Sequence, residues 1–287
     1  MKLGIALSGG GIRGIAHAGV LQALEDNKIK IDVIGGTSAG SIIASMYAMG
    51  FKPKEIFREF KENADSIIKT NYLPIISGVG SYIKNKKITL TGLRSGEELE
   101  KIYNKKGKEM GVLNISQIKM PLVIPSVDLI TSKEYVFTNY IPKCEDNSQY
   151  ITDITVGKAV RASSSFSAFF SPCIYKDFAF IDGGALDNTP VNEVKKQGAD
   201  KVIAVKFQSD PITKESNIMD IVMKTIDIMG SKISEESLEM SDYVLDVVTD
   251  KTGLLDTQKL DKCYDFGYQA VVEKMDEINE VLDIWFI

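Results

Sequence analysis

The chain contains a single histidine, His17, among its 287 residues. A mechanism that uses histidine as its general base would therefore have to use that one. The three cysteines, Cys144, Cys173 and Cys263, are widely spaced and odd in number, so they predict neither a disulfide framework nor a metal site. Candidate catalytic groups must be sought among other side chains.

Basic charge and long apolar runs are also scarce. Acidic residues outnumber basic ones by 39 to 34, a formal net charge of −5, which argues against nucleic acid as the main partner because phosphate binding needs a basic surface. No unbroken run of about 18 apolar residues occurs, so no transmembrane helix is expected. The apolar run near Met1 is too short for a signal peptide. We expect a cytoplasmic protein, whose contact with the inner membrane surface would be peripheral.

Short apolar runs alternate with helical patterns over most of the chain. The runs that predict strands are Leu3–Leu7, Leu122–Leu129, Lys133–Thr138, Phe178–Ile181, Lys201–Phe207 and Tyr243–Val248. The helical patterns include Ala39–Met49, Val191–Lys196, Asn217–Met240 and a long amphipathic one at Asp256–Leu282, which is compatible with self-association. This alternation predicts a three-layer α/β fold. There is no internal repeat and no domain linker, so residues 1–287 are expected to form one domain.

Between a strand-like run at Val33 and a helical pattern from Ile42 lies the pentapeptide Gly36-Thr37-Ser38-Ala39-Gly40. Small residues on both sides of Ser38 allow a sharp strand-to-helix turn that exposes the hydroxyl and aims a helix N-terminus at it. The pattern therefore predicts a nucleophilic serine. It is also compatible with a glycine-rich turn whose serine only caps the helix.

A second glycine-rich stretch, Ser8-Gly9-Gly10-Gly11-Ile12-Arg13-Gly14, follows the first predicted strand. Its G-x-G-x-x-G pattern matches the dinucleotide-binding fingerprint, but the acidic residue that should end the second strand is missing, because Asp32 precedes that strand. We favour another use: backbone N–H groups of Gly9, Gly10 and Gly11 binding the oxyanion that forms when Ser38 attacks a carbonyl. Arg13 would steady this loop, meet an anionic substrate, or lie solvated at the surface.

The base for Ser38 is predicted to be Asp182. His17 falls within the helix that follows the glycine loop, among small or apolar neighbours, and is expected to pack at the helix–sheet interface. Asp182 leaves an apolar strand into Gly183 and Gly184, and a carboxylate in a partly dehydrated site can accept the serine proton. Asp182 is also compatible with a structural Asx turn.

These blocks, in this order, resemble those of the patatin-like phospholipases. The likeness extends from Leu3 to Val205 and includes Arg161-Ala162-Ser163-Ser164, Phe170-Ser171-Pro172 and Leu186-Asp187-Asn188-Thr189-Pro190. The resemblance implies a three-layer α/β/α patatin-like fold with a central, mostly parallel sheet, its core blocks in 3–205 and 206–287 part of the same domain. It implies a bacterial-type lipid acyl hydrolase with Ser38 as nucleophile, Asp182 as base, an oxyanion loop at Gly9, Gly10 and Gly11, and supporting roles for Arg13 and Gly183. It implies no metal or organic cofactor.

The leading prediction is hydrolysis of carboxylic esters in phospholipids or lysophospholipids. An acyltransferase with the same nucleophile and a non-catalytic regulatory protein are the alternatives; intact Ser38 and Asp182 argue against the second. The irregular apolar segment Ser66–Ile83 is compatible with a flap over an acyl-chain groove or with a packed loop. The apolar C-terminus, Ile284–Ile287, would pack on its own domain, a bilayer interface or a second subunit.

Overall fold

The structure is a computed structural model that describes residues 1–68, 92, 94–143, 147–167, 169–208, 218–250, 252 and 257–283. Most of the predicted apolar segment Ser66–Ile83 and the C-terminal residues 284–287 lie outside these ranges. The strands are β1 (Leu3–Leu7), β2 (Val33–Gly36), β3 (Leu122–Asp128), β4 (Lys133–Thr138), β5 (Tyr150–Ile151), β6 (Cys173–Tyr175), β7 (Phe178–Asp182), β8 (Lys201–Phe207) and β9 (Tyr243–Val247).

These strands form one mixed sheet. Its main path runs β5-β4-β3-β2-β1-β8-β9, and β7 pairs with both β3 and β6. The centre is parallel: β1 lies between β2 and β8, with Leu7 opposite Gly36 and Val205. The two strands predicted at Leu122–Leu129 and Lys133–Thr138 are confirmed as β3 and β4, and they form an antiparallel pair. Because β1 and β2 are parallel neighbours, the glycine loop after Leu7 and the turn after Gly36 emerge at the same edge of the sheet.

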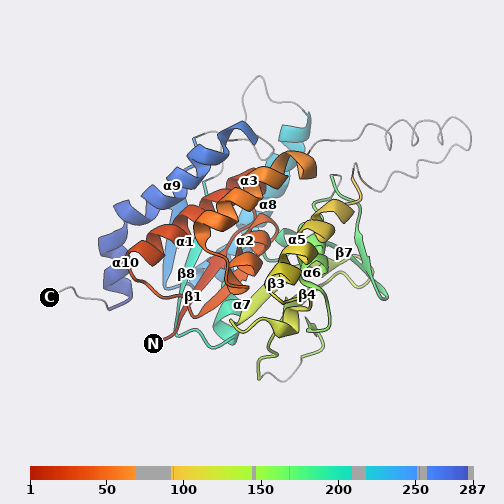
Figure 1. Ribbon diagram of the computed structural model, residues 1–287, viewed down its shortest axis with the longest axis horizontal. Helices are drawn as coiled ribbons and strands as arrows, with labels where there is room; N and C mark the ends of the chain where they lie inside the picture. The colour runs from red at the N-terminus through yellow and green to blue at the C-terminus, as the bar shows by residue number, and fades with distance from the viewer. Residues whose placement is uncertain are drawn as a thin grey trace, which may run out of the picture.

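Helices cover both faces of this sheet (Figure 1). They are α1 (Ala16–Asp26), α2 (Ala39–Ala48), α3 (Pro53–Ile68), α5 (Glu97–Glu109), α6 (Val156–Ser163), α7 (Val191–Lys196), α8 (Ile218–Glu239), α9 (Leu260–Glu273) and α10 (Met275–Val281), with short 3-10 turns η1 (Gly11–Ile15), η2 (Ile115–Gln117), η3 (Gly183–Ala185) and η4 (Thr257–Lys259).

Alternation along the strands divides the core in two. In β1, Ile5 and Leu7 join the larger cluster, which includes α1, α2 and α9. Ala6, between them, joins a smaller cluster with Val194 of α7, against which Leu238 of α8 packs. The sheet therefore lies between two helical layers, and the predicted three-layer α/β/α fold is confirmed.

The predicted long helix at Asp256–Leu282 is wrong in one respect. The structure has a 3-10 turn, then α9, then a break at Lys274 before α10. Ile278 of α10 and Leu282 after it are buried. The change of direction at the break allows Ile278 and Leu282 to be buried. The spacing of apolar residues in the sequence does not reveal such a break, because it assumes one straight helix.

Helices α1 and α9 cross at facing glycines. A Cβ atom at Gly19 would lie 2.0 Å from the carbonyl oxygen of Tyr264, and one at Gly267 would lie 1.9 Å from that of Ala16. Such close backbone approach is open only to glycine.

We expect Gly267→Ala to lower the free energy of unfolding by about 3 kcal/mol, as overpacking of a rigid contact does. Glycine to alanine inside an unhindered helix has the opposite sign, about 1 kcal/mol stabilising. Gly230→Ala in α8 is the matched control, because a Cβ there would meet its nearest neighbour at 3.4 Å. Urea denaturation of both variants measures the free energy of unfolding. A Gly267→Ala protein as stable as wild type would contradict the close backbone contact between α1 and α9.

Candidate active site

Ser38 lies in a sharp turn between β2 and α2. Its backbone has φ 54° and ψ −122°, a conformation that L-residues rarely adopt and that persists where the surroundings enforce it. The flanking glycines allow the turn: a Cβ at Gly36 would lie 2.3 Å from the Gly40 carbonyl oxygen, and one at Gly40 would lie 2.4 Å from that of Leu7. The local sequence therefore folds into the strand–turn–helix geometry expected of a nucleophile elbow.

Hydrogen bonds hold this turn from three sides. The Ser38 N–H donates to Ser163 Oγ at 3.1 Å, at the C-terminal end of α6. The hydroxyl of Thr37 donates to the carbonyl oxygen of Asp187 at 2.8 Å, and the Thr37 N–H donates to that of Leu7 at 3.1 Å. The strained serine is thus fixed to the sheet and to two segments far away in the sequence.

Asp182 ends β7 at the same edge of the sheet. It pairs with Ser126 of β3, and its N–H donates to the Ser165 carbonyl oxygen at 3.1 Å. Its Oδ1 accepts the Gly184 N–H at 2.9 Å, which is the predicted Asx-type turn. Gly183, the next residue, packs closely against β3 and Thr37: a Cβ there would lie 2.4 Å from the Pro125 carbonyl oxygen and 3.1 Å from the methyl carbon of Thr37.

The structure brings Ser38 and Asp182 together. Burial raises the pKa of the Asp182 carboxyl to about 6, while hydrogen bonding from the Ser38 side chain and from the Gly184 amide lowers it. Among the described residues, Oδ2 of Asp182 nevertheless has no partner at ordinary hydrogen-bond geometry. The contact between Asp182 and the Ser38 side chain is therefore looser than a full hydrogen bond.

The raised pKa predicts a stability effect. The carboxyl ionises with a pKa near 3.9 in the unfolded chain and near 6 in the fold, so its ionised form opposes folding above pH 6 and the penalty disappears below about pH 4. We expect Asp182→Asn to be more stable than wild type at pH 8, by up to about 3 kcal/mol. Thermal melting at pH 8 and pH 4 checks this, because the difference should vanish at the lower pH. Equal stabilities at pH 8 would contradict it.

The glycine loop lies against this pair, but one predicted donor is already engaged. The Gly9 N–H donates to the Asn188 carbonyl oxygen at 3.1 Å, so the prediction that it binds an oxyanion is wrong. Gly9 instead serves close packing: a Cβ there would lie 2.5 Å from Asn188 Oδ1 and 3.2 Å from Ser38 Cβ. Gly11 has φ 58°. No partner for the N–H of Gly10 or Gly11 is found in the described part of the chain.

Arg13 packs against the buried side of this loop. It is 4% exposed, its guanidinium donates to the carbonyl oxygens of Gly10 at 3.4 Å and Gln208 at 3.3 Å, and it lies over the ring of Phe207. Of its three predicted roles, the structural one fits this position.

His17 lies buried behind the glycine loop. It is fully buried, its Nε2 donates to the Ser8 carbonyl oxygen at 2.9 Å, and its ring packs on Phe207. Burial lowers its pKa to about 4, with the Ser8 contact opposing that shift. The ring is therefore neutral near pH 7, and its placement at the helix–sheet interface, as predicted, is confirmed.

The sequence does not predict three hydrogen bonds that hold the site: from the Ser38 N–H to Ser163 Oγ, from the Thr37 hydroxyl to the Asp187 carbonyl oxygen, and from the Gly9 N–H to the Asn188 carbonyl oxygen. The only indication in the sequence is that Ser163, Asp187 and Asn188 lie in the stretches that resemble the patatin-like family. Asp187 is itself buried, and its pKa is raised to about 7, first by burial and then by the charge of Glu193. The contacts span 125 and 150 positions of sequence for Ser163 and Thr37, so no local pattern announces them.

Ser163→Ala should slow a reaction at Ser38 about tenfold, because a part-buried N–H that loses its acceptor lets the strained turn relax. The effect should fall on kcat, with KM nearly unchanged. Ser164→Ala is the matched control, since the neighbouring Ser164 hydroxyl is buried with no partner among the described residues. Steady-state kinetics on a soluble ester checks this, and equal effects of the two substitutions would show that the Ser163 contact has no positioning role.

Within the described ranges, no group of three or more His, Cys, Asp or Glu side chains is placed to hold a metal ion. No helix in those ranges is both long enough and apolar enough to cross a bilayer.

Comparison with known proteins shows what the chain resembles. The sequence profile described as patatin-like phospholipase matches residues 5–195. Proteins named lysophospholipase NTE1 are similar: that of Meyerozyma guilliermondii is 31% identical over 215 residues, covering 72% of this chain and 13% of its own length. That of Debaryomyces hansenii is 33% identical over 210 residues, covering 72% and 12%. The chain thus spans about an eighth of each relative.

Two solved structures share the fold. VipD from Legionella pneumophila has a TM-score of 0.52 at 14% identity, with 96% of this chain and 67% of that one covered. The type III effector ExoU has a TM-score of 0.52 at 16% identity, with 96% and 53% covered. At such identities they bear on architecture alone, whereas the profile match spans most of the chain. On this ground, the chain belongs to the patatin-like phospholipase family.

Proposed function

We propose that this protein is a serine lipid acyl hydrolase that cleaves carboxylic esters of phospholipids or lysophospholipids. The observation that carries the proposal is the position of Ser38: a strained, half-buried serine beside a buried carboxylate whose pKa is about 6. Strain and a perturbed pKa gather at functional sites because neither serves stability. Family membership and the relatives' name, lysophospholipase, support a lipid ester as substrate.

In the proposed reaction, Ser38 Oγ attacks the ester carbonyl and its proton passes to Asp182 Oδ2. This oxygen suits the role because it is buried and unpartnered among the described residues, while Oδ1 is held by Gly184. The tetrahedral oxyanion would be stabilised by the N–H groups of Gly10 and Gly11. Gly9 shapes the loop rather than donating to the oxyanion.

Collapse of the intermediate expels the alcohol part of the lipid, which takes the proton from Asp182. A water molecule then attacks the acyl-enzyme, Asp182 accepts its proton, and the fatty acid leaves as Ser38 regains its hydrogen. One carboxyl thus acts as base and then as acid in each half of the cycle. A pKa near 6 suits both tasks at neutral pH better than an ordinary aspartate would.

The proposal extends to residues 1–287 as one patatin-like unit that meets lipid at a surface. Strands β8 and β9 lie in the same sheet as the site, and α9 packs on α1, which supports that extent.

A fluorophosphonate probe tests the proposed nucleophile. We expect it to label Ser38, identified by peptide mass spectrometry, and to block release of fatty acid from lysophosphatidylcholine, diacyl phosphatidylcholine and a short p-nitrophenyl ester. Labelling at another serine, or fatty acid release that persists after complete labelling, would refute the proposal. Transfer of the acyl group to an added alcohol in place of water would identify an acyltransferase.

A further inference from the structure

The side chain of Asn188 lies between the two glycine turns of the site. A Cβ atom at Gly9 would lie 2.5 Å from Asn188 Oδ1 and 3.2 Å from Ser38 Cβ. A Cβ atom at Gly184 would lie 2.8 Å from Asn188 Oδ1 and 3.1 Å from Asp182 Oδ1. The Asn188 carboxamide therefore borders the glycine loop at the point that Ser38 also contacts, and the following turn at the point that the Asp182 carboxylate contacts.

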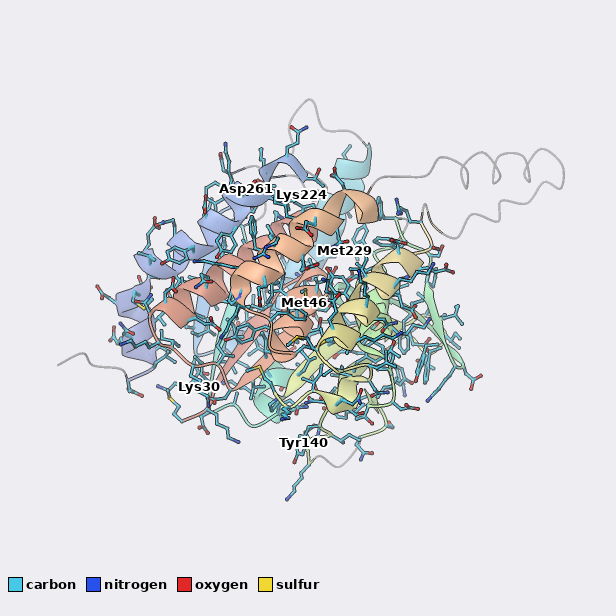
Figure 2. All side chains as sticks on the ribbon, viewed as in Figure 1. Lys30, Met46, Tyr140, Lys224, Met229 and Asp261 are labelled. Carbon is cyan, nitrogen blue, oxygen red and sulfur yellow. The ribbon has the colours of Figure 1, made fainter. Side chains whose placement is uncertain are left out.

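The backbone at Asn188 is held on two sides. Its carbonyl oxygen accepts the Gly9 N–H at 3.1 Å. Helix α8 packs on the same segment, because a Cβ at Gly230 would lie 3.4 Å from the Gly184 carbonyl oxygen and 3.9 Å from Asn188 Cβ. Figure 2 labels Met229, the residue before Gly230 in this helix. The glycine loop and α8 thus fix where the side chain of Asn188 begins.

The carboxamide at the end of that side chain makes no hydrogen bond to any described residue. Asn188 is half-buried, so part of its side chain is open to solvent. The Cβ–Cγ torsion of asparagine is broad and nearly two-fold, and its oxygen and NH2 group have similar size. The group can therefore turn its NH2 toward Ser38 without displacing a neighbour and without losing a hydrogen bond.

We propose that the Asn188 carboxamide donates an N–H to the oxyanion formed at Ser38, as a third donor beside the amides of the glycine loop. The inference rests on the proposed function, because it assumes an ester carbonyl that Ser38 attacks. It also accounts for the arrangement at Gly9. The N–H of Gly9 is taken by the Asn188 carbonyl oxygen, and the carboxamide of the same asparagine supplies a donor where Gly9 meets Ser38.

A neutral donor suits a position next to a buried carboxylate. A lysine or arginine there would form an ion pair with Asp182 and lower the pKa of that carboxyl. A carboxamide donates a hydrogen bond without adding charge, so the pKa of about 6 that burial gives Asp182 is retained. One such donor at an oxyanion contributes about a hundredfold to kcat.

Asn188→Leu tests the proposal, because leucine keeps the branched shape of the side chain and removes its donor. We expect kcat for a soluble p-nitrophenyl ester to fall about a hundredfold with KM nearly unchanged, and Asn188→Ala to have the same effect. Both variants should melt close to wild type, since the backbone contact with Gly9 remains and no hydrogen bond of the described structure is lost.

Asn27→Leu is the matched control. Asn27 is also half-buried, and its carboxamide donates to the Ala23 carbonyl oxygen at 2.8 Å. It follows α1 and precedes β2, so it lies at the opposite edge of the sheet from Ser38. Although this substitution removes a hydrogen bond, it should leave kcat and KM unchanged.

A trifluoromethyl ketone distinguishes a donor from a residue that only supports the fold. The Ser38 oxygen adds reversibly to its carbonyl carbon while the serine proton passes to Asp182, and the oxygen of the resulting hemiketal occupies the oxyanion position. An isotopic label at that carbon reports by NMR the pH at which this oxygen ionises. Loss of a donor to the charged oxygen should raise that midpoint by about two pH units in Asn188→Leu. A midpoint equal to that of wild type, or a normal kcat, would overturn the proposal.

The pH profile of kcat/KM separates two sites of action. If the carboxamide donated to Asp182 instead, Asn188→Leu would raise the activity midpoint above about 6 and leave the hemiketal midpoint in place, which would also overturn the proposal. If the proposed function is wrong, wild type hydrolyses no ester and forms no hemiketal at Ser38. Wild type that does both, with Asn188→Leu behaving identically, would refute the inference alone.

Discussion

Replacing Ser38 by alanine should abolish ester hydrolysis, at least about a thousandfold in kcat/KM, without loss of the fold. The substitution removes the attacking oxygen, and alanine can be tolerated at φ 54° only because the hydrogen bonds around Thr37 and the glycine contacts hold the turn. Asp182→Asn should be comparably inactive, because an amide keeps the Gly184 contact through its oxygen but cannot accept the serine proton. Fatty acid release and p-nitrophenyl ester hydrolysis measure both variants.

His17→Gln is the control that separates a dyad from a histidine-dependent mechanism. Glutamine retains an N–H to donate to the Ser8 carbonyl oxygen, the one contact His17 makes through Nε2. We expect this variant to keep most of its activity. A folded His17→Gln protein with no activity, or an Asp182→Asn protein with near-normal activity, would refute Asp182 as the base. Double substitution of Ser38 and Asp182 should cost little more than either alone, since the two act as a unit.

Activity should rise with pH through a midpoint near 6. The proposed base works only when ionised, and burial, opposed in part by Ser38 and Gly184, raises the pKa of Asp182 to about 6. Below that midpoint kcat/KM should fall about tenfold per pH unit, so that about a hundredth remains at pH 4; above it the profile should be flat. Stopped assays with a soluble ester avoid the ionisation of the lipid substrate.

Two variants assign that midpoint. His17→Gln should leave it unchanged, because His17 titrates near 4 and makes its contact to the glycine loop rather than to Ser38. Asp187→Asn should also leave it in place, although the pKa of Asp187 is raised to about 7 and its carbonyl oxygen holds Thr37. A midpoint near 4, or one that moves with either variant, would mean that Asp182 is not the titrating base.

The glycines around Ser38 differ in how far the sequence predicts their roles. The sharp turn predicted from the small residues around Ser38, Gly36 and Gly40 among them, is confirmed, because close backbone approach follows from the residue type. The prediction for Gly9 is wrong, because whether an N–H is available depends on what lies opposite. The Asn188 carbonyl comes from a segment 179 positions later in the chain, 188 − 9, and takes that donor. For the same reason the acceptor of the Ser38 amide, Ser163, could not be identified.

The sequence by itself determined most of the order of strands and helices, the strand–turn–helix at Ser38, and the packing of His17 between helix and sheet, since each depends on local periodicity, glycine spacing or neighbouring residue types. Only the tertiary structure decided which amides remain available near Ser38, how far burial raises the pKa of Asp182, and that α8 packs its inner side on the Asp182 turn. Those properties arise from desolvation and from contacts between distant segments, and both are set by what folds against a residue rather than by its neighbours in the chain.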